Sequence, residues 1–322
     1  MGFRLAPAAV LLAVVFSTSG CGHESAKSSS AAPLARNGDI LFMSLRVRNS
    51  HERLYLMPPD GTHQRPITRA PGNVVAPTWS PDGKWIAYRT AETLKKTCPQ
   101  LYVMRADGTR ARRLTHDGGC YGAPAWSPDG RRLAFARRRG EVGNDPIWTM
   151  NVDGTGLRRL TQSDESNQDP AWSPDGTMIA FTPIYPSAIW LINADGTNEH
   201  RLTKPSNEDE GDFQPDWSPD GEWIAFSRSD DPTEGRGGTR YRHDIYVVRP
   251  DGTGLRKLTR HAGANFVPAW SPDGKRIVFA SDRKHSDLMD IYAMNADGGG
   301  QKRLTEGTID NFWPDWRAAS SP

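Results

Sequence analysis

Short apolar segments recur along this chain, separated by polar segments rich in Gly, Pro, Asp and Ser. Ile86-Ala87-Tyr88 is one example, and Leu101-Tyr102-Val103-Met104 follows it after a polar stretch. Short segments rich in β-branched and aromatic residues are typical of strands. No stretch keeps a 3.6-residue apolar period long enough for a helix. The pattern therefore predicts an all-β fold built from many short strands.

These segments belong to an internal repeat marked by Pro-x-Trp-Ser-Pro-Asp-Gly. The motif contains Trp79, Trp126, Trp172, Trp217 and Trp270, and a sixth Pro-Asp-Trp without the turn ends at Trp316. Successive tryptophans are 47, 46, 45, 53 and 46 residues apart. After each Trp come an Ile-Ala-Phe-type segment, an Ile-Tyr-type segment, an Asp-Gly turn and a short Leu-Thr. A period of this length with four strands per unit predicts a blade-type repeat.

The connections within a unit have the chemistry of tight turns. In Ser80-Pro81-Asp82-Gly83 the Pro fixes φ for the second place of a type I turn, and the Gly takes the left-handed conformation that follows. Asn193-Ala194-Asp195-Gly196 has the same logic, and both segments predict hairpin connections. The Asp residues of these turns are expected to cap the turns and not to bind metal.

The phase of the repeat predicts how the ends of the chain meet. Before the first Trp there are already second, third and fourth strands, around Ile40–Phe42, Leu54–Met57 and Ile67-Thr68. After the last Asp-Gly turn there is only a first strand, around Trp316. A ring in which these segments share one sheet leaves no exposed sheet edge, whereas a linear solenoid would leave both ends half-built. We predict a six-bladed β-propeller of four-stranded antiparallel blades, closed by pairing the C-terminal first strand with the three N-terminal strands.

The repeat pattern, from Pro-x-Trp-Ser-Pro-Asp-Gly through Ile-Ala-Phe and Ile-Tyr-x-Met-Asn-Ala-Asp-Gly to Arg-Leu-Thr, resembles the TolB-type β-propeller repeat and covers residues 37–317. The resemblance implies a six-bladed propeller in an exported bacterial protein. TolB-like translocation proteins carry an α/β domain before the propeller, where this chain has only a short segment. Peptidases with related propellers add an α/β-hydrolase domain, and no part of this chain is left to encode one.

The first 36 residues are expected to be an export signal followed by a flexible tether. Residues 1–20 have a positive start at Arg4 and an apolar run too short to span a bilayer, as in a signal peptide. The run leads into Cys21 and resembles a bacterial lipoprotein signal, which implies lipidation of Cys21. An ordinary secretory signal cleaved nearby is the alternative. Residues 21–36 are Ser- and Ala-rich and are interpreted as a flexible tether, and residues 318–322 as a tail.

Composition narrows the class of protein further. The chain is 36% apolar and 24% charged, with a mean hydropathy of -0.64 and a formal net charge of +2. These values exclude a multi-span membrane protein, a collagen and a charged disordered chain, and they provide no global field for nucleic acid. With Cys21 assigned to lipid, Cys98 and Cys120 remain as an even pair in an oxidising compartment, which favours a disulfide. Two buried thiols are the alternative.

Alternating strand direction sorts the loops onto two faces. The Ser-Pro-Asp-Gly and Asn-x-Asp-Gly turns share one face (the turn face). The loops joining second to third strands, and those crossing to the next blade, share the other (the variable face), where binding is usually located. Beside the central channel this face is predicted to present a ring of partner- or ligand-binding residues: Tyr121, Asn167, Asp212, Phe213, Asn265, Phe266, Asn311 and Phe312. The alternative is that the aromatics pack between blades and the amides bond loop backbone.

Charge is also uneven on the variable face. The crossing loops are mostly acidic and the outer loops mostly basic, which predicts an acidic channel mouth inside a basic rim; solvated loop charge is the alternative. The acidic set comprises Asp117, Asp164, Glu165, Asp169, Glu208, Asp209, Glu210, Asp212, Glu306 and Asp310. The basic set of the rim comprises Arg46, Arg48, Lys95, Lys96, Arg137, Arg138, Arg139, Arg236, Arg240, Arg242, Arg283 and Lys284.

Motifs for catalysis are absent from the sequence. It has no Gly-x-Ser-x-Gly, phosphate-binding loop, His-Glu-x-x-His or paired Cys-x-x-Cys. The histidines of the variable-face loops lie on different blades, so scattered surface histidines are preferred to a shared metal site: His51, His116, His243, His261 and His285. We therefore expect no catalytic residue, no metal and no cofactor.

The leading functional hypothesis is an exported, lipid-anchored, monomeric propeller that binds a cell-envelope protein or glycan through its variable face without catalysis. It would sit at the periplasmic or extracytoplasmic side of the cell membrane, contact the membrane only through its lipid, and bind no nucleic acid. The alternatives are an enzyme of lyase or hydrolase type at the channel mouth, and a subunit of an envelope translocation system. Convergence of three or more of the histidines and carboxylates would favour the enzyme.

Overall fold

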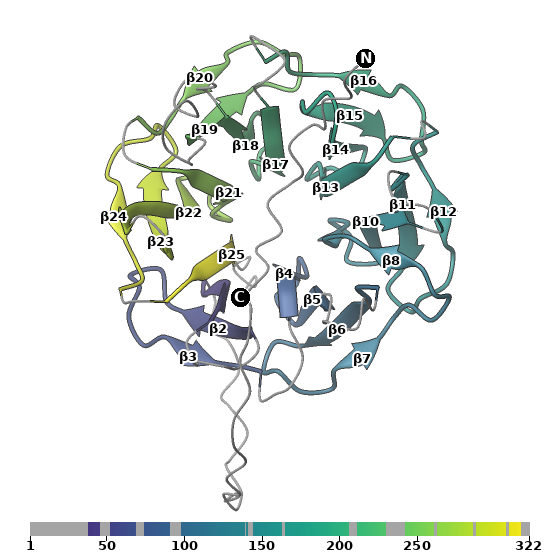
Figure 1. The fold of residues 1–322 in the computed structure, drawn as a ribbon, viewed down its shortest axis with the longest axis horizontal. Helices are drawn as coiled ribbons and strands as arrows, with labels where there is room; N and C mark the ends of the chain where they lie inside the picture. Colours follow the sequence, from purple (N-terminus) through teal and green to yellow (C-terminus); the bar gives the residue numbers. More distant parts are fainter. Residues whose placement is uncertain are drawn as a thin grey trace, which may run out of the picture. The chain divides into compact units, whose positions relative to one another are not determined.

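The structure, a computed structural model, describes residues 38–45, 52–68, 74–90, 98–138, 140, 144–162, 165–205, 211–229, 242–260, 263–285, 288–306 and 309–316. The predicted signal peptide, Cys21, tether and tail lie outside these residues. All regular structure in the described part is β, arranged as six antiparallel sheets around a central channel. Figure 1 looks along that channel, with β4, β13, β17, β21 and β25 innermost. The predicted fold class is confirmed.

Each sheet runs from the channel outward in chain order, apart from the blade that joins the two ends. That closing blade contains β25 (Asn311–Trp316), β1 (Ile40–Ser44), β2 (Arg53–Met57) and β3 (Arg65–Pro66). The next comprises β4 (Val74–Trp79), β5 (Trp85–Thr90), β6 (Leu101–Arg105) and β7 (Arg112–Arg113). The third has β8 (Cys120–Tyr121), β9 (Ala125–Trp126), β10 (Arg132–Arg138), β11 (Ile147–Asn151) and β12 (Arg158–Arg159).

The remaining three blades have the same order. They comprise β13 (Asn167–Trp172), β14 (Met178–Pro183), β15 (Trp190–Asn193) and β16 (His200–Arg201); β17 (Gly211–Trp217), β18 (Ile224–Ser229), β19 (His243–Val248) and β20 (Arg256–Lys257); and β21 (Asn265–Trp270), β22 (Arg276–His285), β23 (Leu288–Asn295) and β24 (Lys302–Arg303).

The ring closes as the repeat phase predicted. Strand β25 pairs antiparallel with β1, placing Trp316 opposite Ile40 and Asn311 opposite Ser44. The first and last described strands therefore lie in one sheet, which gives that blade its fourth strand and covers the inner edge of β1.

The core lies between neighbouring blades. The central Phe of the second strand is fully buried in five blades, for example Phe226 and Phe279 at 0% exposure. One cluster joins Ile245 and Val247 of β19 to Trp270 and Phe279 of the next blade. Because each blade buries one face on the blade before it and the other on the blade after it, its strands carry apolar residues on both faces, as in doubly covered sheets.

The short Leu-Thr or Ile-Thr segments lie just beyond the outer strands. The outermost strand is the pair of residues before them, such as Arg112–Arg113 of β7, which corrects the placement of the first fourth strand at Ile67-Thr68 to Arg65–Pro66. The Thr has a distinct role: its Oγ1 accepts a hydrogen bond from a backbone N–H in the first half of the third strand or just before it. Six pairs repeat this bond at 2.9–3.1 Å: Thr68–Leu54, Thr115–Leu101, Thr161–Ile147, Thr203–Ile189, Thr259–Ile245 and Thr305–Ile291.

The turns have the predicted chemistry. In the first Ser-Pro-Asp-Gly turn, Asp82 Oδ1 accepts from Ser80 Oγ at 2.6 Å and from the Lys84 N–H at 3.0 Å, while Gly83 has a φ of 63°. The hydrogen bonds lower the pKa of Asp82, although its partial burial opposes them. The Asp side chains of the turn face are therefore occupied by their own turns.

Each innermost strand is interrupted by a bulge at the residue before its Pro. Five of these residues have positive φ, between 49° and 56°: Ala76, Asp169, Gln214, Val267 and Trp313. Proline has no N–H for the ladder and is tolerated at bulges. In the third blade the interruption is wider and separates β8 from β9. The bulge halfway along the strand directs these residues and their neighbours to the channel.

Candidate functional site

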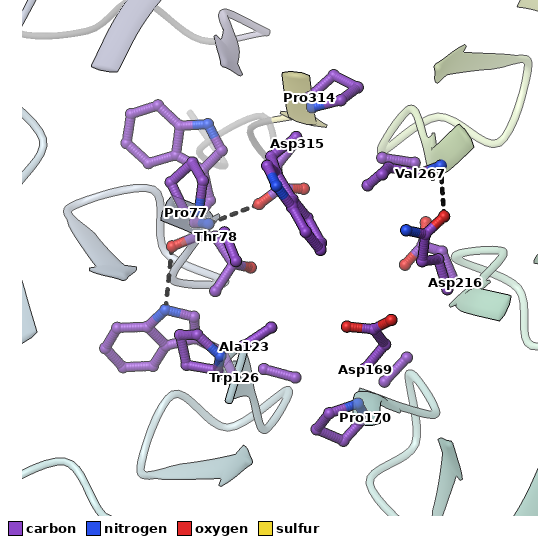
Figure 2. Close-up of a pocket in the computed structure, with 18 of the residues that line it drawn as sticks. Pro77, Thr78, Ala123, Trp126, Asp169, Pro170, Asp216, Val267, Pro314 and Asp315 are labelled. Atoms are coloured by element: carbon purple, nitrogen blue, oxygen red, sulfur yellow. Dashed lines mark hydrogen bonds between the residues drawn. The ribbon is translucent and has the colours of Figure 1, made fainter. Parts of the chain in front are cut away.

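A cavity of about 260 Å³ occupies the half of the channel next to the turn face. It is lined in every blade by the segment that begins at the residue before the Pro and ends at or near the Trp, such as 76–81 and 313–316. Figure 2 shows these segments around the cavity. Six prolines, one from each blade, make part of its wall rigid and apolar, and the rest of the wall includes polar side chains: Pro77, Pro124, Pro170, Pro215, Pro268 and Pro314.

Three carboxylates line the cavity, from three different innermost strands (Figure 2). Asp216 Oδ2 accepts the backbone N–H of Trp270 in the next blade at 2.7 Å. Asp315 Oδ2 accepts the backbone N–H of Trp79 at 2.6 Å, which links the C-terminal strand to β4. Asp169 has no hydrogen-bond partner among the residues described here. Two of the three therefore join neighbouring blades, and none forms a hydrogen-bonded ion pair.

Burial raises the pKa of all three side chains. The pKa of Asp169 rises to about 6, opposed only by the more distant charge of Arg89. That of Asp216 rises to about 7, because burial and the neighbouring charge of Asp315 outweigh the hydrogen bond from Trp270. The pKa of Asp315 rises to about 6. The channel therefore changes charge near neutral pH.

Only some of the residues that line the cavity could be predicted from the sequence. Asp169 belongs to the predicted acidic mouth, whereas the sequence pattern predicts no role for Asp216 and Asp315 beyond the Trp motif. A signal was present: these two blades have Pro-Asp-Trp where the others have Thr or Ala before the Trp. Knowing that this position faces the channel requires the bulge, which the sequence pattern does not reveal.

The eight residues predicted to bind a ligand all lie beyond this cavity, toward the variable face. Asp212, Asn265 and Tyr121 each contact an Arg of the neighbouring second strand. Asp212 accepts Arg228 Nε at 2.6 Å and Nη2 at 2.8 Å, while Asn265 Oδ1 accepts Arg283 Nη2 at 2.7 Å. The Tyr121 hydroxyl accepts from Arg137 at 3.2 Å and donates to Asp117 at 2.5 Å. These polar groups are buried and engaged within their own blade.

The remaining amides of the predicted ring shape the crossing loops. Asn167 Nδ2 donates to the carbonyl of Glu165, and Asn311 Nδ2 to that of Ile309, both at 2.9 Å. Both side chains are 2% exposed. These contacts agree with the interpretation that the amides bond loop backbone.

The predicted aromatics do come together. The ring of His243 lies 4.3 Å from that of Phe266 and 6.0 Å from that of Phe213, and Phe266 lies 6.4 Å from Phe312. All four side chains are half-buried. They form a continuous row, the aromatic row, across three innermost strands and the start of β19. His243 was not among the predicted binding residues; its position in the longest repeat unit, the 53 residues from Trp217 to Trp270, was the available signal.

An exposed apolar loop adjoins this row. Ile184 and Tyr185, between β14 and β15, are 46% and 62% exposed. The loop is tied to the next blade because the Asp212 N–H donates to the Ser187 carbonyl at 3.2 Å. Gly211 leaves room there: a Cβ at this position would lie 2.5 Å from the Phe213 ring and 2.8 Å from Ser187 Cβ.

The predicted acidic mouth is partly neutralised where the structure describes it. Asp117 pairs with Arg137, and Asp212 with Arg228. Hydrogen bonds from Tyr121, Gly119 and Arg137 hold the pKa of Asp117 at about 2 despite the opposing effect of burial. Asp164 and 208–210 lie outside the described residues, as do Arg46, Arg48, Lys95, Lys96, Arg139, Arg236 and Arg240 of the predicted rim.

Cys98 and Cys120 are joined by a disulfide, with their Cα atoms 4.5 Å apart. It links the loop before β6 to the crossing loop that enters β8. Gln100 strengthens the link, because its amide donates to the carbonyls of Cys98 at 3.1 Å and Gly119 at 2.7 Å. The disulfide and these bonds fix two variable-face loops to each other.

Within the described residues, no group of three or more His, Cys, Asp or Glu side chains is placed to hold a metal ion. His51 and His261 lie outside them, and His116 and His243 lie in different blades. The same part of the chain contains no helix long and apolar enough to cross a membrane.

The curated relatives that match this chain are TolB proteins, over short segments. A protein named TolB homolog from Chlorobium luteolum is 52% identical over 40 residues, which is 12% of this chain and 9% of that protein. The Tol-Pal system protein TolB from Nitratidesulfovibrio vulgaris is 43% identical over 47 residues, 14% and 11% of the two chains. Each match thus spans about a tenth of the relative's length.

Solved structures share the fold at low sequence identity. TolB from Acinetobacter baumannii aligns with a TM-score of 0.71 and 21% identity, over 87% of this chain and 67% of that one. An oligogalacturonate lyase in complex with manganese aligns with a TM-score of 0.57 and 17% identity, over 83% and 77%. At such identities the likeness extends to the fold alone. The profile of the TolB β-propeller domain, however, matches residues 37–232 and 215–321. The chain belongs to the TolB β-propeller family.

Proposed function

We propose that this chain is an exported propeller that binds a protein of the cell envelope through its variable face, without catalysis. The aromatic row of Phe213, His243, Phe266 and Phe312 is the observation that supports this most directly. Aromatic side chains offer large contact area at low entropic cost and are enriched at the centres of protein interfaces. The exposed Tyr185 beside the row extends the surface outward.

The relatives support an envelope partner. One of them is named as a protein of the Tol-Pal system, and the chain shares its propeller family. The aromatic row lies on a scaffold held by a closed ring and by a disulfide that joins the β4–β7 and β8–β12 blades. A rigid scaffold lowers the ordering cost of binding, so this face suits recognition of a partner segment.

The first test locates the partner. A photoreactive benzoylphenylalanine is placed at Tyr185 or Phe266 in cells of the native host, and adducts are identified by mass spectrometry. We expect an adduct of defined protein mass from both positions. The matched control is the same residue at Thr197, which is exposed on the turn face, and should give none. Adducts from Thr197 alone, or adducts from the variable face that are sensitive only to glycan hydrolases, would contradict the proposal.

Phe266→Ala is expected to weaken binding of that partner about tenfold or more, as truncation of a central aromatic does. Leu255→Ala is the matched control. Leu255 is also a large apolar residue and is 46% exposed, but it lies between the Asp-Gly turn after β19 and strand β20, away from the variable face. Isothermal titration of the purified proteins measures both affinities. Circular dichroism melts show whether Phe266→Ala keeps the fold, since the ring packs on His243. An unchanged affinity in a folded Phe266→Ala variant would count against the aromatic row.

We further propose that Cys21 carries a lipid that holds the propeller at the membrane. Cys21→Ser is expected to move the protein from the membrane fraction to the soluble fraction and to abolish labelling by an alkyne fatty acid. Cys98→Ser is the control, since it should leave both unchanged. If the wild-type protein takes up no label and is found in the soluble fraction, residues 1–20 are an ordinary secretory signal peptide and not a lipoprotein signal.

A further inference from the structure

The cavity on the turn-face side of the channel has chemistry that binding through the variable face does not use. Its lining includes three Asp and no Lys, Arg or His. The three carboxylates come from separate strands and line one cavity of the channel (Figure 2). A cavity with walls of one charge concentrates ions of the opposite charge.

The negative groups have no hydrogen-bonded counterion among the described residues. Asp216 and Asp315 accept backbone N–H groups, and each raises the cost of charging the other. Asp169 is opposed only by the charge of Arg89, at a distance. Elsewhere in the same molecule, Asp117 and Asp212 are paired directly with arginines. Among the described residues, the channel carboxylates thus differ from Asp117 and Asp212 in having no directly paired arginine.

The rest of the wall combines proline, alanine and tryptophan side chains with the polar residues Thr78, Ser80 and Gln214. Trp313 occupies the bulge position where the other blades have Ala, Asp, Gln or Val, and it does so at a φ of 53°. The positive φ is shared with the bulge residues of four other blades, so this blade differs from them by its side chain and not by its backbone. The indole of Trp313 offers a face for a cation, and the six prolines offer apolar contact. An ammonium or guanidinium group on an apolar stem matches both features.

The size of the cavity limits the ligand. About 260 Å³ is below the roughly 300–1,000 Å³ of sites for drug-sized ligands. It suits one long side chain or a small organic cation. A bare metal ion fits less well, because no three carboxylates or other ligands converge among the described residues.

We propose that this cavity binds the cationic end of a Lys- or Arg-type side chain, presented by a basic peptide segment. The carboxylates neutralise the charge, and Trp313 and the prolines contact the stem. This site is separate from the aromatic row, so either proposal can fail without the other.

The test is an NMR titration of the propeller, following indole N–H signals, with acetyl-arginine amide and acetyl-lysine amide. Acetyl-norleucine amide is the neutral probe of similar size. We expect saturable binding of both cations and at least tenfold weaker binding of norleucine. Asp169→Asn should weaken the cations about fivefold, and the triple variant D169N/D216N/D315N beyond detection. Asp195→Asn, which removes one charge from an exposed turn, should change nothing.

Several results would overturn the proposal. Equal binding of norleucine amide would indicate an apolar pocket only. Calcium that binds tighter than the organic cations and displaces them would indicate a metal site. Failure of every probe to bind, or cation affinities that survive in a folded triple variant, would show that the carboxylates serve the packing of the blades alone. Crosslinking from Phe266 should be the same in wild type and Asp169→Asn, which separates this test from that of the variable face.

Discussion

Ending the chain after Glu306, before β25, is expected to abolish the cooperatively folded propeller. Strand β25 is the innermost strand of the closing blade, and β1 has no other partner on that side. Removing it exposes the edge of β1 and opens the ring. The bond from the Trp79 N–H to Asp315, which links the closing blade to the next, disappears with it.

The packing lost with this strand is large. Trp316 is 6% exposed in the cluster that includes Phe42 and Val278, while Phe312 and Trp313 pack against the cluster around Leu41. Truncating a single buried Trp or Phe typically costs about 3–5 kcal/mol, whereas domains are stable by only about 5–15 kcal/mol. Losing three such side chains and a strand together therefore exceeds what the rest of the ring can sustain.

The measurement is a thermal or urea melt followed by circular dichroism and tryptophan fluorescence. Removing only residues 318–322 is the matched control and should leave the midpoint unchanged within about one degree. Trp316→Ala, a smaller lesion in the same place, should lower the free energy of unfolding by about 3–5 kcal/mol. A chain ending at Glu306 that still melts in one sharp transition near the wild-type midpoint would show that the ring does not depend on this strand.

The ring could be predicted because its information is local and repeated. Each Ser-Pro-Asp-Gly turn specifies one hairpin, and the same turn chemistry recurs in blade after blade. The offset between Ile40 at one end and Trp316 at the other then fixes which strands remain to be paired. A strand that is assigned wrongly in one blade can be corrected by comparison with the other blades. The architecture can therefore be predicted from the pattern without knowledge of any long-range contact.

The channel chemistry could not be predicted in the same way. Whether Asp216 points to solvent, to the next blade or into the channel depends on a bulge of one residue, since a shift of one place reverses the facing of a strand. The partner of Asn265 is Arg283, two residues after the Ser281 that lies opposite it, whereas two residues after the Pro183 opposite Asn167 the chain has Tyr185 and not an arginine. Such contacts depend on individual residues that differ among the blades. The repeat pattern contains only the residues that the blades share, so it does not predict these contacts.

Lowering the pH from about 8 to about 5 is expected to stabilise the propeller, opposite to the usual effect of acid on buried, paired carboxylates. In the folded state the pKa values of Asp169, Asp216 and Asp315 are about 6, 7 and 6, against about 3.9 in an unfolded chain. The folded state therefore binds more protons between these limits. The stabilising contribution of these three carboxyl groups is fully present below about pH 4 and is lost as the pH rises through 6 to 7.

The sign is opposite for Asp117, whose folded pKa is about 2. Its contribution is present above about pH 4 and is lost only as the pH falls toward 2, so it does not oppose the gain between pH 8 and 5. Asp169, Asp216 and Asp315 are only partly buried, so solvent screening reduces the effect of their raised pKa values, and we expect a combined gain of about 2–4 kcal/mol over this interval.

Urea unfolding at pH 8, 7, 6 and 5 measures this gain directly. The triple variant D169N/D216N/D315N should have a nearly flat profile and should exceed the wild type in stability at pH 8, because it removes the charges that burial disfavours. Asp216→Asn alone should account for the largest share, since Asp216 has the highest pKa and an amide oxygen can still accept the Trp270 N–H. Asp195→Asn on the exposed turn should keep the wild-type slope. A wild-type stability that falls steadily from pH 8 to pH 5 would mean that the channel carboxylates are ionised in the folded protein, with a counterion supplied from outside the channel wall.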